Sequence, residues 1–87
     1  MKKISKELLD RLISEAIYVC RRYDYNEVST ALFQRRLMTD YDHAKVVVDE
    51  LVKIKLMVDC RIDKDEDGYK NVICRVDKEK LKQLSSN

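Results

Sequence analysis

The chain has 87 residues, of which 45% are hydrophobic and 39% charged, and its 18 basic and 16 acidic residues give a formal net charge of +2. A chain this short forms one domain, residues 1–87, with a small core and no room for a deep enzyme cleft. The composition excludes a disordered chain, and no apolar run is long enough for a membrane span. The start, Met1 to Lys3, leads into a charged amphipathic segment and not into a signal peptide.

The first predicted helix begins at Ser5, which can cap it, and ends near Tyr23, because Asp24 to Asn26 are turn-forming residues. Its apolar residues recur at helical spacing, with charged residues on the opposite face. The apolar stripe consists of Leu8, Leu9, Leu12, Ile13, Ala16, Ile17 and Cys20.

Two shorter helices follow in close succession. Val28 is an isolated β-branched residue before a cap at Ser29 or Thr30, and a second helix covers Ala31 to Leu37. Asp40 is the expected N-cap of a third helix, Tyr41 to Lys55. We expect its inner stripe to contain Tyr41, Ala44, Val47, Val48 and Leu51, with either Ile54 or the stem of Lys55 at its end.

Alternating residues then predict a β-hairpin over residues 57 to 76. Leu56, Val58, Cys60 and Ile62 should share one face of the first strand, and Val72, Cys74 and Val76 one face of the second. Gly68, the only glycine, suits the turn between the strands. Asp77 caps a short final helix that contains Leu81 and Leu84. The predicted fold is therefore α+β, a winged helix-turn-helix with three helices, a two-stranded wing and a short C-terminal helix.

The cysteines and tyrosines are expected to serve packing. Cys20, Cys60 and Cys74 are odd in number and contain no CxxC pair, which is typical of a reducing cytoplasm, where we place the protein. Cys60 and Cys74 should face one another across the hairpin as core thiols. The tyrosines at the edges of the core are expected to pack there more than to stack on bases, namely Tyr18, Tyr23, Tyr25 and Tyr41.

The stretch VSTALFQRRLMTDYDHAKVVVDELVKIKLM resembles the helix-turn-helix of the gamma domain of FtsK/SpoIIIE DNA translocases over about 30 residues. The residues that carry the resemblance are Gln34, Arg35, Arg36, Tyr41, Ala44, Asp49, Glu50 and Leu51, supported by apolar matches at Leu32, Leu37, Val47, Val48, Leu56 and Met57. The resemblance implies a winged helix that binds DNA. The chain itself contains no ATPase motor, so a translocase role would belong to a partner.

The chain departs from that family where the family reads bases. An Asn and two Arg read a G-rich sequence there, and Asp42, His43 and Val46 stand in their places, with Asp40 where the family has Gly. Arginine makes two hydrogen bonds to guanine, whereas aspartate cannot and is repelled by phosphate. The family's sequence preference is therefore not expected here.

The first functional hypothesis is a non-enzymatic protein that binds double-stranded DNA mainly through phosphates. Basic side chains at the ends of the first and second helices can hold phosphates, with help from the third helix. The expected DNA-binding residues are Arg35, Arg36, Tyr41, His43, Lys45 and Lys53, with His43 the candidate for a base edge. Further cations stand at Lys2, Lys3, Lys6, Arg21 and Arg22.

The alternative is a protein-interaction module or inhibitor that binds a basic partner, such as a nucleic-acid enzyme. The outer face of the third helix and the wing tip are acidic, and together they would attract a basic protein surface and repel DNA. The residues expected to form this patch are Asp42, Asp49, Glu50, Asp65, Glu66 and Asp67.

No cofactor or metal is expected. Asp63, Asp65, Asp67 and Gly68 follow the opening of a calcium loop, but its twelfth position holds Cys74 in place of Glu, and its flanks are predicted strands. The three cysteines and His43 match no zinc spacing. His43, the only histidine, has no nucleophile nearby in the sequence, so we predict that the protein is not an enzyme.

Overall fold

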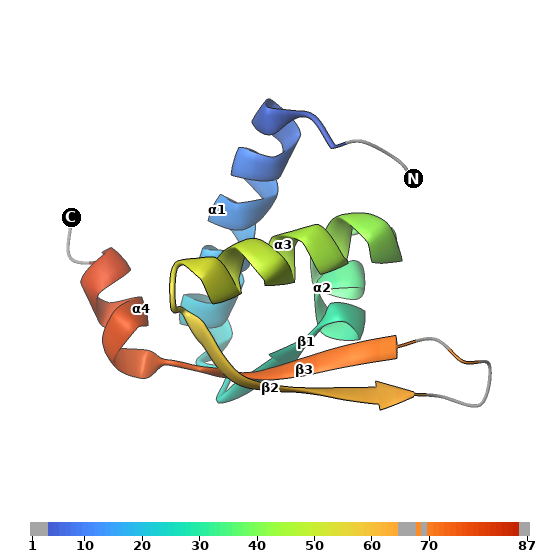
Figure 1. Cartoon of the computed structure of the whole chain (residues 1–87). Coiled ribbons are helices and arrows are strands. Elements are labelled where there is room, and N and C mark those ends of the chain that lie inside the picture. Colours follow the sequence, from blue (N-terminus) through green and yellow to red (C-terminus); the bar gives the residue numbers. More distant parts are fainter. Residues whose placement is uncertain (1–3, 65–67, 69, 86–87) are drawn as a thin grey trace.

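The computed structural model describes residues 4–64, 68 and 70–85. Within them the chain forms a small α+β fold with four helices and a three-stranded antiparallel sheet (Figure 1). The elements in chain order are α1 (Lys6–Tyr23), β1 (Glu27–Ser29), α2 (Thr30–Arg36), α3 (Tyr41–Lys53), β2 (Met57–Lys64), β3 (Lys70–Val76) and α4 (Lys78–Ser85). In the described part of the chain, no helix combines the length and apolar character that a membrane crossing requires.

The helix starts confirm the predicted caps, and of the two candidates before α2 the cap is Ser29. In each case a side-chain oxygen accepts a hydrogen bond from the backbone N–H three residues ahead. Without the cap this N–H would lack a partner. These hydrogen bonds run from Leu8 to Ser5 (3.1 Å), Leu32 to Ser29 (3.1 Å), His43 to Asp40 (2.9 Å) and Lys80 to Asp77 (3.2 Å).

The end of α3 differs from the prediction. Lys55 has a left-handed backbone, with φ of 68°, so the helix stops at Lys53 and not at Lys55. Beyond the helix, the N–H of Lys55 donates to the carbonyl of Val52, and the N–H of Leu56 donates to the carbonyl of Leu51, each at 3.0 Å. Ile54 lies in this turn and is 37% exposed, and Lys55 is exposed too, so the predicted end of the inner stripe is wrong for both residues. The turn instead buries Leu56 completely.

The sheet contains a strand that the sequence did not predict. Val28 is part of β1, which pairs with β3, so β3 lies in the middle of the order β1-β3-β2 (Figure 1). A strand of three residues has too little alternation to be recognised from sequence. It forms because β3 offers it a partner.

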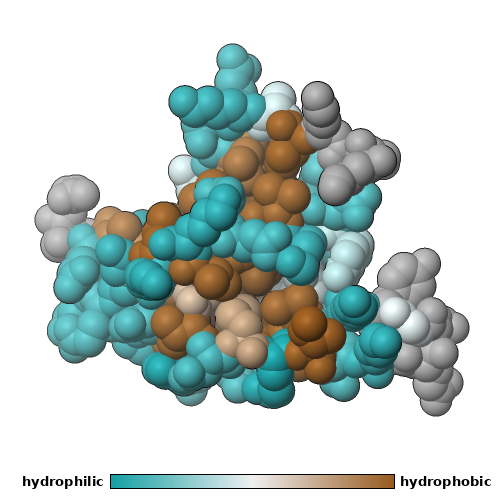
Figure 2. All heavy atoms as spheres, in the orientation of Figure 1, coloured by the Kyte–Doolittle hydropathy of each residue, from teal (hydrophilic) through white to brown (hydrophobic). Residues whose placement is uncertain are grey.

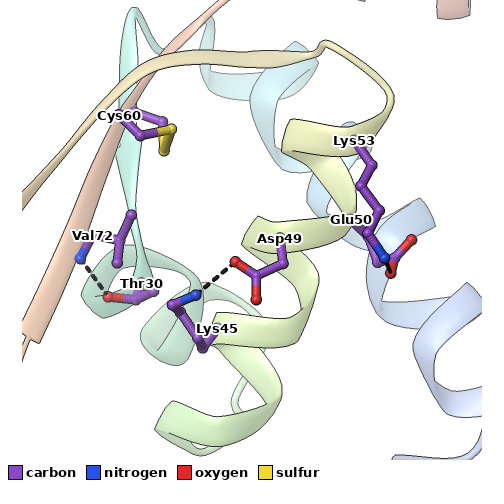
Figure 3. Close-up of polar contacts among 8 residues, drawn as sticks. Thr30, Lys45, Asp49, Glu50, Lys53, Cys60 and Val72 are labelled. Atoms are coloured by element: carbon purple, nitrogen blue, oxygen red, sulfur yellow. Dashed lines mark hydrogen bonds and ion pairs between the residues drawn. A yellow bond between two sulfur atoms is a disulfide. The ribbon is translucent and has the colours of Figure 1, made fainter.

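A network at one buried threonine joins α2 to β3. The Thr30 hydroxyl, 1% exposed, accepts a hydrogen bond from the N–H of Val72 at 3.2 Å and donates to the side-chain carbonyl of Asn71 at 2.9 Å. The same Asn71 oxygen accepts from the N–H of Ala31 at 3.1 Å. Figure 3 shows the Thr30–Val72 bond between the start of the helix and the strand. The network therefore fixes the hairpin to the helices.

The first strand of the hairpin does not alternate as predicted. Asp59, with φ of 53°, and Cys60 stand together opposite Cys74 and form a β-bulge, since the register shifts between Val58 and Arg61. Beyond the bulge, Ile62 is 62% exposed although it pairs with the buried Val72. The predicted inner face of the second strand is confirmed, because Val72, Cys74 and Val76 are all buried.

Cys60 and Cys74 face one another, as predicted, but they are not two core thiols. They form a disulfide with their Cα atoms 4.1 Å apart, and Cys60 is exposed while Cys74 is buried. The bond joins the bulge of β2 to the middle of the sheet. Cys20 is the free cysteine and is buried. Burial raises the pKa of its thiol to about 11, and the positive charge of Lys78 has a smaller effect that lowers this pKa.

One core unites the helices and the sheet. The predicted inner residues of α3 are confirmed, because Ala44, Val47, Val48 and Leu51 are each at most 1% exposed. Phe33 of α2 is buried among them. Figure 2 shows hydrophobic residues along the seam between the helices on the face it displays. Tyr18 and Tyr23, expected at the edge of this core, are instead 60% and 47% exposed.

Replacement of Leu51 by Ala should destabilise the fold by ~2–5 kcal/mol, because it removes a fully buried side chain and leaves a cavity. Chemical denaturation monitored by circular dichroism measures this loss. Val52→Ala is the matched control, since Val52 is 38% exposed and should cost less than ~1 kcal/mol. Equal losses for the two variants would contradict the packing of α3.

Reduction of the Cys60–Cys74 disulfide should lower the free energy of unfolding by roughly 3 kcal/mol, because the bond closes a loop with a sequence separation of 14. Thermal denaturation with and without a phosphine reductant measures the change. The Cys60→Ser variant should not respond to the reductant. A melting temperature that is unchanged after complete reduction, verified by thiol titration, would contradict a stabilising role of the bond.

Candidate nucleic-acid interface

The outward face of α3 follows from its buried stripe. Since Ala44, Val47, Val48 and Leu51 point inward, the opposite side of the helix carries Asp42, Val46, Asp49 and Lys53. Asp42, Asp49 and Lys53 are exposed and Val46 is half-buried. This face is therefore short of positive charge.

The two lysines predicted to bind DNA from α3 form ion pairs with carboxylates of the same helix. The Nζ atom of Lys45 lies 2.6 Å from Oδ1 of Asp49, and that of Lys53 lies 3.0 Å from Oε1 of Glu50. Figure 3 shows the two pairs on opposite flanks of α3. Exposed pairs of this kind contribute at most about 1 kcal/mol, so a phosphate can compete for either lysine.

His43 and Tyr41 lie at the start of α3 and are not fully exposed. The His43 side chain is 19% exposed, and its Nδ1 atom lies 3.2 Å from the Thr39 hydroxyl and 3.6 Å from Oδ1 of Asp40. One ring nitrogen thus already faces the turn before α3. Tyr41 is half-buried at the first position of the helix.

The two arginines of α2 are exposed but lie on different flanks of that helix. The Arg36 guanidinium lies over the Tyr23 ring, 4.4 Å from its centre, and lines a depression together with Tyr18. Arg35 lines another depression, together with Arg61 of β2. The structure therefore does not bring Arg35 and Arg36 together as one phosphate clamp.

The hairpin contributes a pair of cations that sequence reasoning missed. Lys64 of β2 and Lys70 of β3 are direct cross-strand partners, and both are exposed. The side chains of such partners leave the sheet on the same side, with Cβ atoms about 5 Å apart. This is the side of Ile62 and Val72, because those two are partners two residues away. Sequence reasoning missed this pair because the acidic tip residues separate the two lysines in the sequence. Only the register of the hairpin shows that they stand opposite one another.

The predicted acidic patch can be traced only in part. Asp42 is exposed and has no ion-pair partner among residues 4–64 and 70–85, while Asp49 and Glu50 are paired with lysines. Asp65, Glu66 and Asp67 lie outside the described residues, as do the cations Lys2 and Lys3. The part of the calcium-like stretch that contains Asp65 and Asp67 lies outside them too.

Side chains able to bind a metal are not clustered in the described part of the chain. No three His, Cys, Asp or Glu residues there are placed to hold an ion. Two of the three cysteines weighed as zinc ligands are consumed by the Cys60–Cys74 disulfide, and Cys20 is fully buried.

No model of a known protein family matches the chain, and no curated protein matches its sequence.

Proposed function

We propose that the protein is a winged helix. Its element order supports this proposal: α1 is followed by the short β1, by the pair α2 and α3 joined by a tight turn, and by the β2–β3 hairpin. In a winged helix the third helix and the hairpin form the surface that meets DNA. Here these would be α3 and the β2–β3 hairpin.

On this surface we propose that the protein binds double-stranded DNA without acting as an enzyme and without a cofactor. The observation that carries the proposal is the Lys64–Lys70 pair. Like charges directly opposite one another destabilise a sheet, and an anion between them removes the repulsion. A DNA phosphate is such an anion, because both ammonium groups can donate hydrogen bonds to its oxygens.

The contact is expected to be electrostatic, with little sequence selectivity. The outward face of α3 offers Asp42, Val46 and Asp49 to the groove, where the resembled gamma domain reads bases with Asn and Arg. Neither Val46 nor a carboxylate holds a phosphate. The lysines of α3 would exchange their carboxylate partners for phosphates, with His43 as the candidate for a base edge.

The double variant Lys64→Gln/Lys70→Gln should weaken duplex binding and lower the slope of log affinity against log salt by about 0.9 for each phosphate that the hairpin no longer neutralises. Fluorescence anisotropy of a labelled duplex over a salt series measures both quantities. The control, Lys6→Gln/Lys80→Gln, removes the same charge from α1 and α4, which lie away from the end of the hairpin (Figure 1). Equal effects of the two double variants would exclude the hairpin as the binding surface.

In the same assay, Arg35→Ala/Arg36→Ala tests the sequence-based assignment of phosphate binding to α2. Because these arginines lie on different flanks of α2, we expect the variant to release at most one phosphate, and so to change the slope by at most about 0.9. An unchanged affinity and salt slope would remove α2 from the interface and leave the hairpin and α3.

A second candidate function is favoured by Asp42. This exposed carboxylate stands on the outward face of α3 without an ion-pair partner in the described part of the chain, next to the half-buried Val46. A basic protein surface would satisfy the charge and cover the apolar side chain. In this alternative the protein would bind a basic partner, such as a nucleic-acid enzyme, through α3 and the acidic wing tip.

Charge reversal separates the two candidates. The triple variant Asp42→Lys/Asp49→Lys/Glu50→Lys should strengthen non-specific duplex binding and weaken any complex with a basic partner, because it turns the outer face of α3 positive. Anisotropy with a duplex, beside pull-down from the native host, measures both. Tight duplex binding by the wild type that the reversal abolishes would count against the protein-partner candidate.

A further inference from the structure

A second surface of the protein carries exposed tyrosines between arginines. It lies where α1 and α2 end, and we call Tyr18, Arg22, Tyr23, Arg36 and Met38 the tyrosine–arginine surface. Tyr18, Tyr23 and Met38 are 60%, 47% and 91% exposed. Tyrosine, arginine and methionine are enriched in protein–protein interfaces relative to other surfaces, and tyrosine and arginine dominate their binding energy.

The side chains of this surface are held in place before any partner arrives. The Tyr23 ring has the Arg36 guanidinium 4.4 Å and the Arg22 guanidinium 5.7 Å from its centre, and the Tyr25 ring centre 5.6 Å away. Side chains fixed in this way lose less conformational entropy on binding. Between Tyr18, Tyr23 and Arg36 lies an open depression of about 290 Å³, whose floor includes Val19 and Leu37. The depression is large enough for one apolar side chain.

The charge of the surface selects an anionic partner. Both guanidinium groups lie near the Tyr23 ring, and neither Arg22 nor Arg36 forms an ion pair in the described part of the chain. Glu15, the acidic residue that lines the depression, lies 3.8 Å from Arg11. An incoming carboxylate would therefore meet two unneutralised guanidinium groups, to which it can bind bidentately.

Met38 adds an independent observation. It has a left-handed backbone, with φ of 52°, which non-glycine residues adopt at a cost. Met38 is 91% exposed, so its side chain takes almost no part in packing within the chain. Met38 directly follows Leu37, which lines the depression. An exposed methionine at this edge adapts its shape to an apolar partner.

We propose that the tyrosine–arginine surface binds an acidic segment of a partner protein that inserts one apolar side chain between Tyr18, Tyr23 and Leu37. A carboxylate of the segment pairs with Arg36 or Arg22, and Met38 covers the inserted side chain. Single-stranded nucleic acid fits less well, because the Arg36 guanidinium already covers the Tyr23 ring on which a base would stack. The partner is different from the DNA proposed above, and the tyrosine–arginine surface includes neither the hairpin lysines nor the lysines of α3.

The test is selection from a phage-displayed library of random peptides on the full chain, with counter-selection on the double variant Tyr18→Ser/Arg36→Gln. Enriched peptides should carry Asp and Glu around one Leu, Phe or Trp. A synthetic peptide from the selection should bind the double variant about tenfold or more weakly, as expected when hot-spot residues are removed. Isothermal titration calorimetry measures this affinity.

Three further variants test whether the peptide binds at the tyrosine–arginine surface. Met38→Gly should weaken peptide binding while the melting temperature holds or rises, because glycine suits a positive φ. Arg21→Gln, the matched control in the last turn of α1, and the hairpin variant Lys64→Gln/Lys70→Gln should bind the peptide like the wild type. Far-UV circular dichroism verifies that each variant is folded.

The proposal is overturned if the enriched peptides have no acidic bias, or if the double variant binds them as well as the wild type does. It is also overturned if oligo(dT) binds to the wild type, loses affinity in the double variant, and no acidic peptide is enriched. Weaker duplex binding by the hairpin variant leaves the peptide result unaffected, so the failure of one proposal is distinguishable from the failure of the other.

Discussion

The position of the hairpin relative to the helices depends on the hydroxyl of Thr30. The β1–β3 register places Ser29 opposite Ile73, so the next residue, Thr30, would face Val72 if the strand continued. The backbone instead turns into α2, and the Thr30 side chain takes the hydrogen bond from the Val72 N–H that a strand would have taken. A buried N–H without a partner costs about 1–3 kcal/mol, so this contact specifies where the strand ends and the helix begins. The side-chain oxygen of Asn71 completes this network, because it accepts hydrogen bonds from the Thr30 hydroxyl and from the N–H of Ala31.

The corners of the fold use left-handed residues other than glycine. The chain has one glycine, yet each of the first three helices is followed by a left-handed residue: Asp24, Met38 and Lys55. At the last two corners the backbone closes in the same way, since the N–H of the residue after the left-handed one donates to a carbonyl five residues back, Thr39 to Gln34 and Leu56 to Leu51. These hydrogen bonds and the burial of Leu56 offset the strain. The tight turn between α2 and α3 is thus maintained by backbone contacts, which leaves the side chain of Met38 exposed to a partner.

The formal charge of +2 does not describe any one surface of the protein. On α3 the lysines are paired with carboxylates of the same helix, so its outward face is short of positive charge. On the hairpin two lysines stand opposite one another, and at the ends of α1 and α2 two arginines rest on a tyrosine ring. Each arrangement meets a different class of anion. We propose a phosphate for the hairpin, and for the arginines a carboxylate beside an apolar group.

The amino-acid sequence by itself determined what depends on neighbours within about one helical turn. The caps at Ser5, Asp40 and Asp77, the part of the α3 stripe from Ala44 to Leu51 and the inner face of β3 are of this kind, and these agree with the structure. Only the tertiary structure decided what depends on residues far apart in the chain. Val28 becomes a strand residue because Cys74 lies beside it, Cys60 is bonded to Cys74, and Ile62 is exposed although it pairs with the buried Val72. The pairing of Lys64 with Lys70 and the contact of Arg36 with the Tyr23 ring likewise depend on how separate elements come together. Such pairings are set by the register of the sheet and the packing of helix ends, which no local spacing of residues encodes.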